Sequence, residues 1–352
     1  MTAPLIAIYG AYGHTGRLVA TELLARDHHL LLTGRDPHAL RTLATELDAP
    51  HRVQTRTAPL DDTAALHQIA RDATVIVHCA GPFSRTGRPI ANAALAGHCH
   101  YIDHAVESHH VKHLFDAYQT PARDAGITMI PGLSFYGGLG DLLASAVTTG
   151  HTALDRVIVG YAVTGWRLTP GAKDTAAQLF AETDRITYSD GAHHIGYIEP
   201  TNTVFPFPPP LGPRTVIAPF PSCDIVTIPR HVPARNVDLR LTAATFEEPG
   251  VFDSEHIDAD ARARTDFTVA VLSTAEPGTP GAHGHATGHD LWRAGALASA
   301  EAAARIATGH GPAKTGVLST AEAFPARPFL RDLERLGAFT LTLPDDTPPP
   351  ER

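Results

Sequence analysis

The chain has 352 residues, enough for two domains, and its 43% hydrophobic content is sufficient for a sizeable core. Its 37 acidic and 28 basic residues give a net charge of −9, which argues against a nucleic-acid-binding surface. The sequence has three cysteines, a small and odd number that does not suit a disulfide framework. This number fits a reducing cytosol, so we expect a cytoplasmic protein. The sequence has no apolar run long enough to cross a bilayer, and we expect neither a signal peptide nor a membrane partner.

The amino-terminal stretch reads as strand, turn, helix and strand. An apolar run from Leu5 to Tyr9 is followed by a glycine-rich turn, and then by a helical pattern of apolar residues that reaches Leu24. A second apolar run, residues 29–32, ends at Gly34. This order predicts the opening of a dinucleotide-binding sheet.

The glycines of the turn are spaced G-x-x-G-x-x-G, and each has a separate role. Gly10 permits a tight turn, Gly13 lets the backbone approach a pyrophosphate, and Gly16 lets the helix pack closely on the strand. The amino end of the helix then faces the diphosphate. A glycine-rich turn without a ligand is the alternative. The residues of this turn predicted to bind the cofactor are Gly10, Tyr12, Gly13, His14, Thr15 and Gly16.

The end of the second strand selects the cofactor. An acidic residue there would bind the ribose 2′-hydroxyl of NAD, but Gly34 is followed by Arg35. A guanidinium suits a 2′-phosphate, so we predict NADP(H). Asp36 precedes Pro37, and we interpret it as the cap of the next helix. A solvated surface charge is the alternative for Arg35.

Helix and strand patterns continue to alternate along the chain. We predict a helix over 37–47, a weak strand over 51–57, a helix reaching residue 70, and an apolar strand over 74–79. The loop after this last strand runs beside the cofactor in doubly wound sheets, although an ordinary turn is the alternative. The predicted contacts in this loop are Ala80, Gly81, Pro82 and Phe83.

Polar side chains follow the next strand. We predict a helix over 86–97 and a strand over 100–103, whose end carries Asp103, His104 and Glu107. Ligands bind at this edge of such sheets. Further on we predict a helix over 111–125, a strand over 128–132, a glycine-rich turn over 133–141 that contains Tyr136, and a helix over 142–147.

Four stretches carry a resemblance to a known family. They are Tyr9-Gly10-Ala11-Tyr12-Gly13-His14-Thr15-Gly16-Arg17, Thr33-Gly34-Arg35-Asp36-Pro37, Cys79-Ala80-Gly81-Pro82-Phe83 with Gly87, and His100-Tyr101-Ile102-Asp103 with Glu107. Together they resemble the saccharopine dehydrogenase-like NADP-binding oxidoreductases, a family that includes trans-acting enoyl reductases. The likeness is best over roughly the first 145 residues. A further stretch that resembles the family is His289-Asp290-Leu291-Trp292, which begins a predicted alanine-rich helix that ends near Gly309.

The resemblance implies an α/β fold: a Rossmann doubly wound parallel sheet with an inserted α+β domain on a mostly antiparallel sheet. We expect the dinucleotide-binding domain over 1–145, a substrate or oligomerisation domain over 146–285, and C-terminal helices over 286–352 that return to the Rossmann domain before a disordered proline-rich tail. It also implies NADP(H) redox chemistry on C=N or C=C bonds. The chain departs from the family at Val106-Glu107 and at 132–136, near the expected substrate site, so the substrate cannot be copied from relatives.

Beyond residue 150 the sequence becomes strand-like, as expected of an antiparallel sheet. The predicted strands are 156–163, 185–189, 194–198, 215–218, 224–228, 237–242 and 265–273, with a short helix over 175–183. Residues 205–210 are rich in proline and read as a rigid extended loop. We interpret this loop as a connector, with a pocket rim or a contact within a homodimer as alternatives.

A reductase positions a hydride and needs a proton donor. Tyr136 is the first candidate, because a phenol can donate to a developing anion; packing beside the nicotinamide is the alternative. Asp103 and Glu107 are the next catalytic candidates. The alternative is that they form a structural hydrogen bond or cap a helix. The predicted substrate contacts are His104, Trp166 and Lys173.

Two histidine clusters carry metal-ligand residue types. His283, His285 and His289 have the right chemistry for zinc, but 22 histidines make chance clusters common and the neighbouring glycines suit a turn. Cys99 and the histidines around it alternate along a strand, which sends neighbours to opposite faces. We therefore predict no metal.

The leading hypothesis is an NADPH-dependent reductase of a small molecule with a C=N or activated C=C bond. A redox-sensing NADP-binding module without turnover is the second, since folds are reused in this way. The third is an oxidative amino-acid dehydrogenase, which would need arginines such as Arg85, Arg88 and Arg167 to hold a carboxylate.

Overall fold

The computed structural model describes residues 3–252, 259–276 and 281–346, which form two compact units. The first unit runs to Ser134 and includes Gly295–Phe324. The second comprises Phe135–Ala294 and continues from Pro325. Of the C-terminal segment over 286–352 that was predicted to return to the first domain, only Gly295–Phe324 belongs to the first unit. The second unit begins at Phe135, about ten residues before the predicted boundary at residue 145.

The first unit contains a seven-stranded sheet in the order β15-β6-β5-β4-β1-β2-β3, in which every pair of neighbours is parallel. The strands are β1 (Leu5–Tyr9), β2 (His29–Gly34), β3 (Val53–Thr57), β4 (Val75–His78), β5 (His100–Asp103), β6 (Thr128–Ile130) and β15 (Gly316–Val317). The first six strands have the doubly wound order, which confirms the predicted Rossmann sheet. The central strands are apolar along their whole length because both faces of the sheet are covered.

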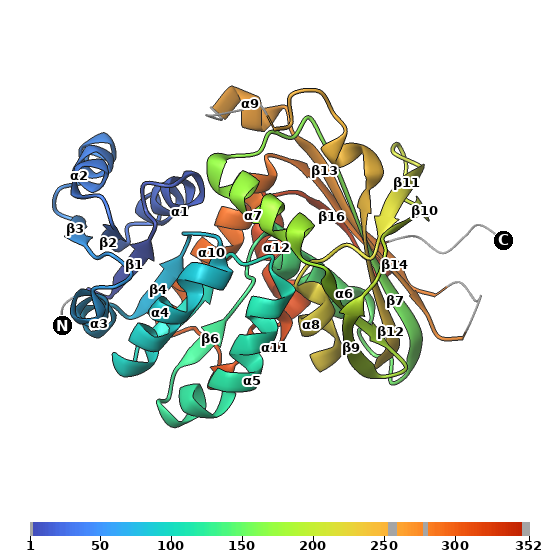
Figure 1. Ribbon diagram of the computed structural model, residues 1–352, viewed down its shortest axis with the longest axis horizontal. Coiled ribbons are helices and arrows are strands. Elements are labelled where there is room, and N and C mark those ends of the chain that lie inside the picture. Colours follow the sequence, from blue (N-terminus) through green and yellow to red (C-terminus); the bar gives the residue numbers. More distant parts are fainter. Residues whose placement is uncertain (1–2, 253–258, 277–280, 347–352) are drawn as a thin grey trace. The chain divides into compact units, whose positions relative to one another are not determined.

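Helices cover the two faces of this sheet. They are α1 (His14–Leu24), α2 (Pro37–Glu46), α3 (Thr63–Asp72), α4 (Phe83–Ala96), α5 (Ser108–Asp124), most of α10 (Leu291–Ala307) and α11 (Thr320–Ala323). The right-handed crossovers place α1 and α2 on one face and α3, α4 and α5 on the other (Figure 1). The carboxyl ends of β1, β2, β4 and β5 thus meet at one edge, the side where ligands bind in such sheets.

The second unit is built on a nine-stranded mixed sheet with the main order β10-β11-β12-β7-β13-β14-β16, and β8 joins β12 to β9. The strands are β7 (Leu154–Thr164), β8 (Asp184–Ser189), β9 (Ala192–Tyr197), β10 (Thr201–Pro206), β11 (Pro213–Ala218), β12 (Ala234–Thr242), β13 (Asp266–Thr274), β14 (His283–His289) and β16 (Thr340–Thr342). Only β12 and β7 pair in parallel, so the sheet is mostly antiparallel, as predicted.

Short helices accompany this sheet. They are α6 (Gly140–Val147), α7 (Pro170–Ala181), α8 (Asp224–Thr227), α9 (Ala259–Ala263) and α12 (Ala326–Arg335). Helix α6 packs on β13 and β14, and α12 packs on α6. Because β16 also pairs with β14, the chain beyond Pro325 belongs to the second unit.

Three local predictions in the second unit were wrong. Residues 224–228, predicted as a strand, begin with α8, and a 3-10 turn continues from Ile228. Phe205 does not lie in a loop but in β10, where it is completely buried, because pairing with β11 outweighs the proline-rich composition. Residues 283–289 form β14 and not a turn. The predicted disordered tail lies outside the described residues.

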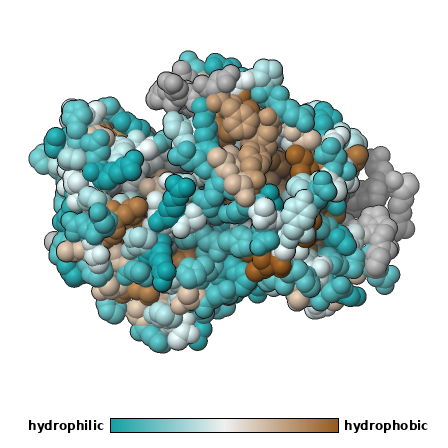
Figure 2. All heavy atoms as spheres, viewed as in Figure 1, coloured by the Kyte–Doolittle hydropathy of each residue, from teal (hydrophilic) through white to brown (hydrophobic). Residues whose placement is uncertain are grey.

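Hydrophilic residues cover most of the face seen in Figure 2, interrupted by a patch of apolar residues. The large exposed apolar side chains of the described residues all belong to the second unit: Phe180, Ile195, Tyr197, Val204 and Phe252. Across the part of the chain that the structure describes, no helix has both the length and the apolar character needed to cross a membrane.

Candidate functional site

The glycine turn after β1 has no room for side chains. Gly10 has a φ of +81°, and a Cβ there would lie 2.7 Å from the Ala80 Cβ. A Cβ on Gly16 would lie 2.8 Å from the Ala11 Cα. The predicted functions of these two glycines therefore match the geometry: one allows the turn, and the other lets α1 pack on it.

The amino end of α1 is suited to an anion. Its N-cap is Gly13, no side chain caps it, and no acidic residue lies in its first turn, which begins His14-Thr15-Gly16. The first backbone N–H groups of a helix have no partner within the helix, and its dipole favours negative charge there. A diphosphate fits this position.

The end of β2 agrees with the predicted choice of cofactor. The ring of Tyr12 covers Gly34 so closely that a Cβ there would lie 2.7 Å from the Tyr12 Cε1. Arg35 is exposed and has no hydrogen-bond or ion-pair partner within the described residues. Asp36 accepts hydrogen bonds from the backbone amides of His38 and Ala39, so its predicted role as the cap of α2 is confirmed. The free charge at this strand end is thus a guanidinium, as a ribose phosphate requires.

The loop after β4 lies against the glycine turn, because Ala80 is the residue that Gly10 leaves room for. The Thr86 hydroxyl donates to the Ala80 carbonyl at 2.5 Å. Gly81 is exposed, and Pro82 is the N-cap of α4, which begins at Phe83. The structure therefore brings the predicted loop and the predicted turn together at one edge of the sheet.

Asp103 is fully buried and joins the ends of β5 and β6. It accepts hydrogen bonds from the backbone amides of Ala105 at 2.9 Å and Gly132 at 2.7 Å, and from the Tyr101 hydroxyl at 2.8 Å. Its Oδ2 also lies 3.0 Å from Nε2 of His110. These four contacts link the carboxylate to both strand ends and to α5, as expected of a residue that holds this edge of the sheet in shape.

The charges of this pair are coupled. Burial would raise the pKa of Asp103, but the hydrogen bond and charge of His110 and the backbone amides hold the pKa at about 2. Burial opposes protonation of His110, yet Asp103 raises its pKa above the ordinary value. His110 fits here because Gly87 has no side chain, since a Cβ there would overlap the imidazole.

Glu107 is also buried and caps α4. Its carboxylate accepts from the backbone amides of Phe83 at 2.8 Å and Val106 at 3.0 Å. Burial raises the pKa of Glu107, against the lowering effect of these hydrogen bonds. This carboxylate therefore fixes the start of the helix that follows the cofactor loop.

His104 lies between two hydroxyl groups of the first unit. Its Nδ1 is 3.1 Å from the Ser134 Oγ, and its Nε2 is 2.9 Å from the Ser299 Oγ. Burial lowers the pKa of His104 to about 4, so the imidazole is neutral at physiological pH. Both ring nitrogens are occupied in this arrangement.

Replacing Asp103 with asparagine is expected to lower the free energy of unfolding by about 3–5 kcal/mol at pH 6, because His110 loses its buried counter-charge. The ion pair is complete above the ordinary aspartate pKa and below the ordinary histidine pKa, so the difference is largest between about pH 4 and 6.5. It shrinks as the pH rises through the raised pKa of His110.

Urea unfolding at pH 6 and pH 9 measures this difference. The control is Asp116→Asn, which breaks the exposed ion pair with Lys112 on α5, the helix that carries His110. It should lower the free energy of unfolding by less than about 0.5 kcal/mol. An Asp103→Asn protein as stable as the control at pH 6 contradicts the assignment.

Tyr136 belongs to the second unit and sits in an aromatic cluster. Its ring centroid lies 4.9 Å from that of Phe135, 5.1 Å from Tyr161, 5.3 Å from Phe220 and 6.2 Å from Trp166. Its hydroxyl is buried without a hydrogen-bond partner among the described residues, and burial raises its pKa. A buried phenol without an internal acceptor remains a neutral donor for a ligand.

The other predicted substrate residues of this unit differ in burial. Trp166 is 5% exposed, and its indole Nε1 also has no partner among the described residues. Lys173 lies in α7 and is half-buried. Two of the arginines considered as partners of a substrate carboxylate have partners within the protein. Arg167 donates to the Trp166 carbonyl at 2.8 Å, and Arg88 interacts with Tyr118, which like Arg88 belongs to the first unit.

Sequence reasoning missed a polar network next to Tyr136. The Tyr161 hydroxyl donates to Asp224, whose other oxygen accepts from the Ser222 hydroxyl at 2.9 Å. Nearby, Nε2 of His231 lies 2.7 Å from Asp141. No periodic pattern could reveal this set, because Tyr161 and Asp224 are 63 residues apart.

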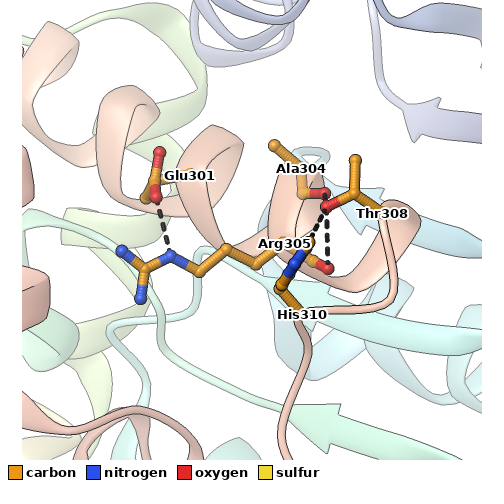
Figure 3. A pocket seen from close by; sticks show the side chains of 5 residues that line it. All are labelled: Glu301, Ala304, Arg305, Thr308 and His310. Atoms are coloured by element: carbon orange, nitrogen blue, oxygen red, sulfur yellow. Dashed lines mark hydrogen bonds and ion pairs between the residues drawn. The ribbon is translucent and has the colours of Figure 1, made fainter.

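No group of three metal-ligating side chains occurs within residues 3–252, 259–276 and 281–346. A shallow pocket of about 450 Å³ lies at the carboxyl end of α10, lined by Glu301, Ala304, Arg305, Thr308 and His310. Figure 3 shows the Arg305 guanidinium turned toward Glu301 and away from the other two polar side chains. Thr308 and His310 bond to each other, so the polar groups of this pocket do not converge on a ligand.

Comparisons with known proteins support the prediction that the first unit is a dinucleotide-binding domain. Residues 6–130 match the saccharopine dehydrogenase NADP binding domain. A trans-acting enoyl reductase of Mycobacterium ulcerans is 31% identical over 137 residues, which are 37% of this chain and 32% of the relative. A probable mitochondrial saccharopine dehydrogenase-like oxidoreductase of Arabidopsis thaliana is 27% identical over 142 residues, 37% of this chain and 31% of the relative. The chain thus spans about a third of the length of these relatives.

A solved structure extends the likeness in fold to both units. Apo saccharopine dehydrogenase (L-Glu forming) from Saccharomyces cerevisiae matches 97% of this chain and 99% of its own, with a TM-score of 0.65 at 12% identity. The fold is therefore shared along the chain, while the likeness in sequence is concentrated in the nucleotide-binding part. Residues 6–130 are similar to the saccharopine dehydrogenase NADP binding domain, which agrees with the resemblance and the cofactor class predicted from the sequence.

Proposed function

We propose that this protein is an NADPH-dependent reductase of a small molecule that carries an activated C=C or C=N bond. The observation that carries the proposal is the edge of the first sheet. There the uncapped α1 and the glycine turn fit a diphosphate, and Arg35 fits the additional phosphate of NADP(H). Reduced nicotinamide, when bound, supplies a hydride.

The residues of the chain shape the cofactor site and supply the proton. Asp103 and Glu107 hold the loop ends around the cofactor site, because each carboxylate accepts hydrogen bonds from two backbone amides. Tyr136 is the proposed proton donor, since its neutral hydroxyl has no acceptor in the described protein. A phenol of this kind would donate a hydrogen bond or a proton to the oxygen of a carbonyl conjugated to the reacting bond.

Within this function we favour a C=C bond conjugated to a carbonyl. Two neutral donors in the aromatic cluster, the Tyr136 hydroxyl and the Trp166 indole, are buried and have no partner among the described residues. Neutral donors suit a carbonyl oxygen, whereas a free amino acid requires charged partners. The trans-acting enoyl reductase relative supports the same choice.

The experiment has two steps. NADPH and NADH are first titrated into the purified protein, and tighter binding of NADPH is expected. NADPH oxidation is then followed with three probes: crotonyl thioester, 1-pyrroline, and a 2-oxo acid with ammonia. A Gly16→Leu variant gives the background, because its side chain would overlap the glycine turn.

Oxidation with the thioester alone supports C=C reduction, and oxidation with 1-pyrroline alone moves the proposal to C=N bonds. Tight NADPH binding with no oxidation by any probe favours a redox-sensing module instead. NADPH oxidation with the 2-oxo acid and ammonia alone, together with reduction of NADP⁺ by the matching amino acid, supports the oxidative dehydrogenase. Tighter binding of NADH than of NADPH refutes the cofactor assignment.

A further inference from the structure

A buried carboxyl group lies next to the residue proposed to donate the proton. Asp224 is fully buried at the start of α8 and faces β7 through Tyr161, whose hydroxyl donates to its Oδ2. The Ser222 hydroxyl donates to its Oδ1 at 2.9 Å. Both oxygens of the carboxyl are thus occupied by hydroxyl groups, and only one of these hydroxyls belongs to the aromatic cluster around Tyr136.

The turn that carries Tyr136 has an unusual backbone. Gly137 has a φ of +90° and a ψ of −83°, a sharp turn that L-residues rarely adopt, while Tyr136 itself is extended. Burial raises the pKa of the Tyr161 hydroxyl, and the nearby backbone amide of Gly137 opposes that rise. Local strain of this kind persists only when the surrounding structure holds it.

The contact between these groups is close. A Cβ on Gly140, the first residue of α6, would overlap both the Tyr161 hydroxyl and the Asp224 carboxylate. The ring of Tyr161 also packs on that of Tyr136, with centroids 5.1 Å apart. Tyr161 therefore contacts the turn through its ring, and Asp224 fixes the direction of its hydroxyl.

We propose that Asp224 is a positioning residue, which acts through Tyr161 to hold the Tyr136–Gly137 turn so that the Tyr136 hydroxyl stays free for a substrate. The proposal rests on the proposed function, since it assigns the turn a role in proton donation. Asp224 does not itself touch the substrate, because both of its oxygens are occupied.

The charge of Asp224 changes near neutral pH. Burial raises the pKa of Asp224 to about 7, against the lowering effect of the Tyr161 and Ser222 hydrogen bonds and with the help of the Asp141 charge. The titratable groups around it are Tyr161 on β7, Cys223 before α8, Asp141 on α6 and, through Asp141, His231. The ionised carboxylate is the stronger acceptor for a phenol, so the hold on the turn tightens as the pH rises through about 7.

The test does not need a substrate. Tyrosine labelled with ¹³C at Cζ is incorporated into the full chain, Tyr136→Phe and Tyr161→Phe assign the two signals, and the spectra are followed from pH 5 to pH 9. In the unaltered protein both signals are expected to move with a midpoint near pH 7. In Asp224→Asn the titration disappears, and the Tyr136 signal shifts or splits.

Ser222→Ala is the matched control, because it removes the hydrogen bond to the oxygen that does not face Tyr161. Its Tyr136 signal should keep its position and still titrate. If Asp224→Asn does not fold, Tyr161→Phe tests the same link, and the Tyr136 signal should shift and lose its titration. A Tyr136 signal unchanged in both variants, or displaced equally by Ser222→Ala, overturns the proposal.

Kinetics separate this proposal from the proposed function. With a substrate from the screen, Asp224→Asn should lower kcat about tenfold, flatten its rise through pH 7, and leave KM for NADPH within about twofold. Unchanged kcat and pH profile count against positioning. Absence of turnover in the unaltered protein counts against the proposed function alone, since the NMR result stands without it.

Discussion

Replacing Arg35 with alanine is expected to weaken NADPH binding by about 10- to 100-fold and to leave NADH binding within about twofold. Hydrogen bonds to charged groups contribute about 1.5–3 kcal/mol, which corresponds to this range. Arg35 is exposed and has no partner in the described protein, so its removal breaks no internal contact. Titration of both coenzymes by fluorescence measures the two affinities.

Arg41→Ala is the control for this experiment, because it removes an equally charged, exposed side chain from the same region. Its NADPH affinity should stay within about twofold at 0.15 M salt, where distant charges are largely screened. An Arg35→Ala protein that binds NADPH as tightly as Arg41→Ala contradicts the assignment of the 2′-phosphate. Equal loss for NADPH and NADH would mean that Arg35 supports the turn and not the phosphate.

Replacing Tyr136 with phenylalanine is expected to lower kcat by about 100- to 10,000-fold, the range usual for a lost proton donor. The same change should leave the melting temperature unchanged or raise it slightly. The Tyr136 hydroxyl is buried without an internal partner, so the apolar ring removes a polar group whose burial is costly. Steady-state kinetics and thermal unfolding, measured side by side, check both parts.

Tyr188→Phe controls for loss of a hydroxyl elsewhere in the second unit, in β8, where activity should not change. An active Tyr136→Phe enzyme would reduce Tyr136 to a packing residue. An inactive variant that also melts well below the unaltered protein would mean that the hydroxyl has a structural partner. Only low activity in a fully stable protein supports proton donation.

The first unit follows from local patterns. The glycine spacing of residues 10–16 and the apolar runs of β1, β2 and β4 indicate a parallel sheet, since only strands buried on both faces are apolar throughout. Asp36 is recognisable as a cap because a short acidic side chain before Pro37 satisfies the first amides of a helix. These signals require only near neighbours in the chain.

The second unit shows where such reasoning ends. Four of the five residues from Asp224 are β-branched, as in a short strand, yet they fold as α8 and the start of a 3-10 turn. Asp224 instead forms hydrogen bonds with Ser222 and the distant Tyr161. Phe205 reads as part of a proline-rich loop but is buried in β10. Tertiary pairing outweighs local preference in sheets of this kind.

The candidate site divides in the same way. The cofactor turn and Arg35 were predicted from the sequence, since the backbone shape that binds phosphate is encoded within about 30 residues. The sequence left Asp103 and Glu107 open between a catalytic and a structural role, because burial and partners decide between the two for a carboxylate. Asp103 finds one of those partners, Gly132, 29 residues away.

The sequence by itself determined a Rossmann sheet, a glycine turn and a guanidinium directly after the second strand, because each depends on residues adjacent in the chain. Only the tertiary structure decided that Tyr136 has a free hydroxyl and that Asp224 lies next to its turn. The physical reason is that burial and hydrogen-bond partners arise between segments far apart in the chain, and these set both the pKa of a group and its availability to a ligand.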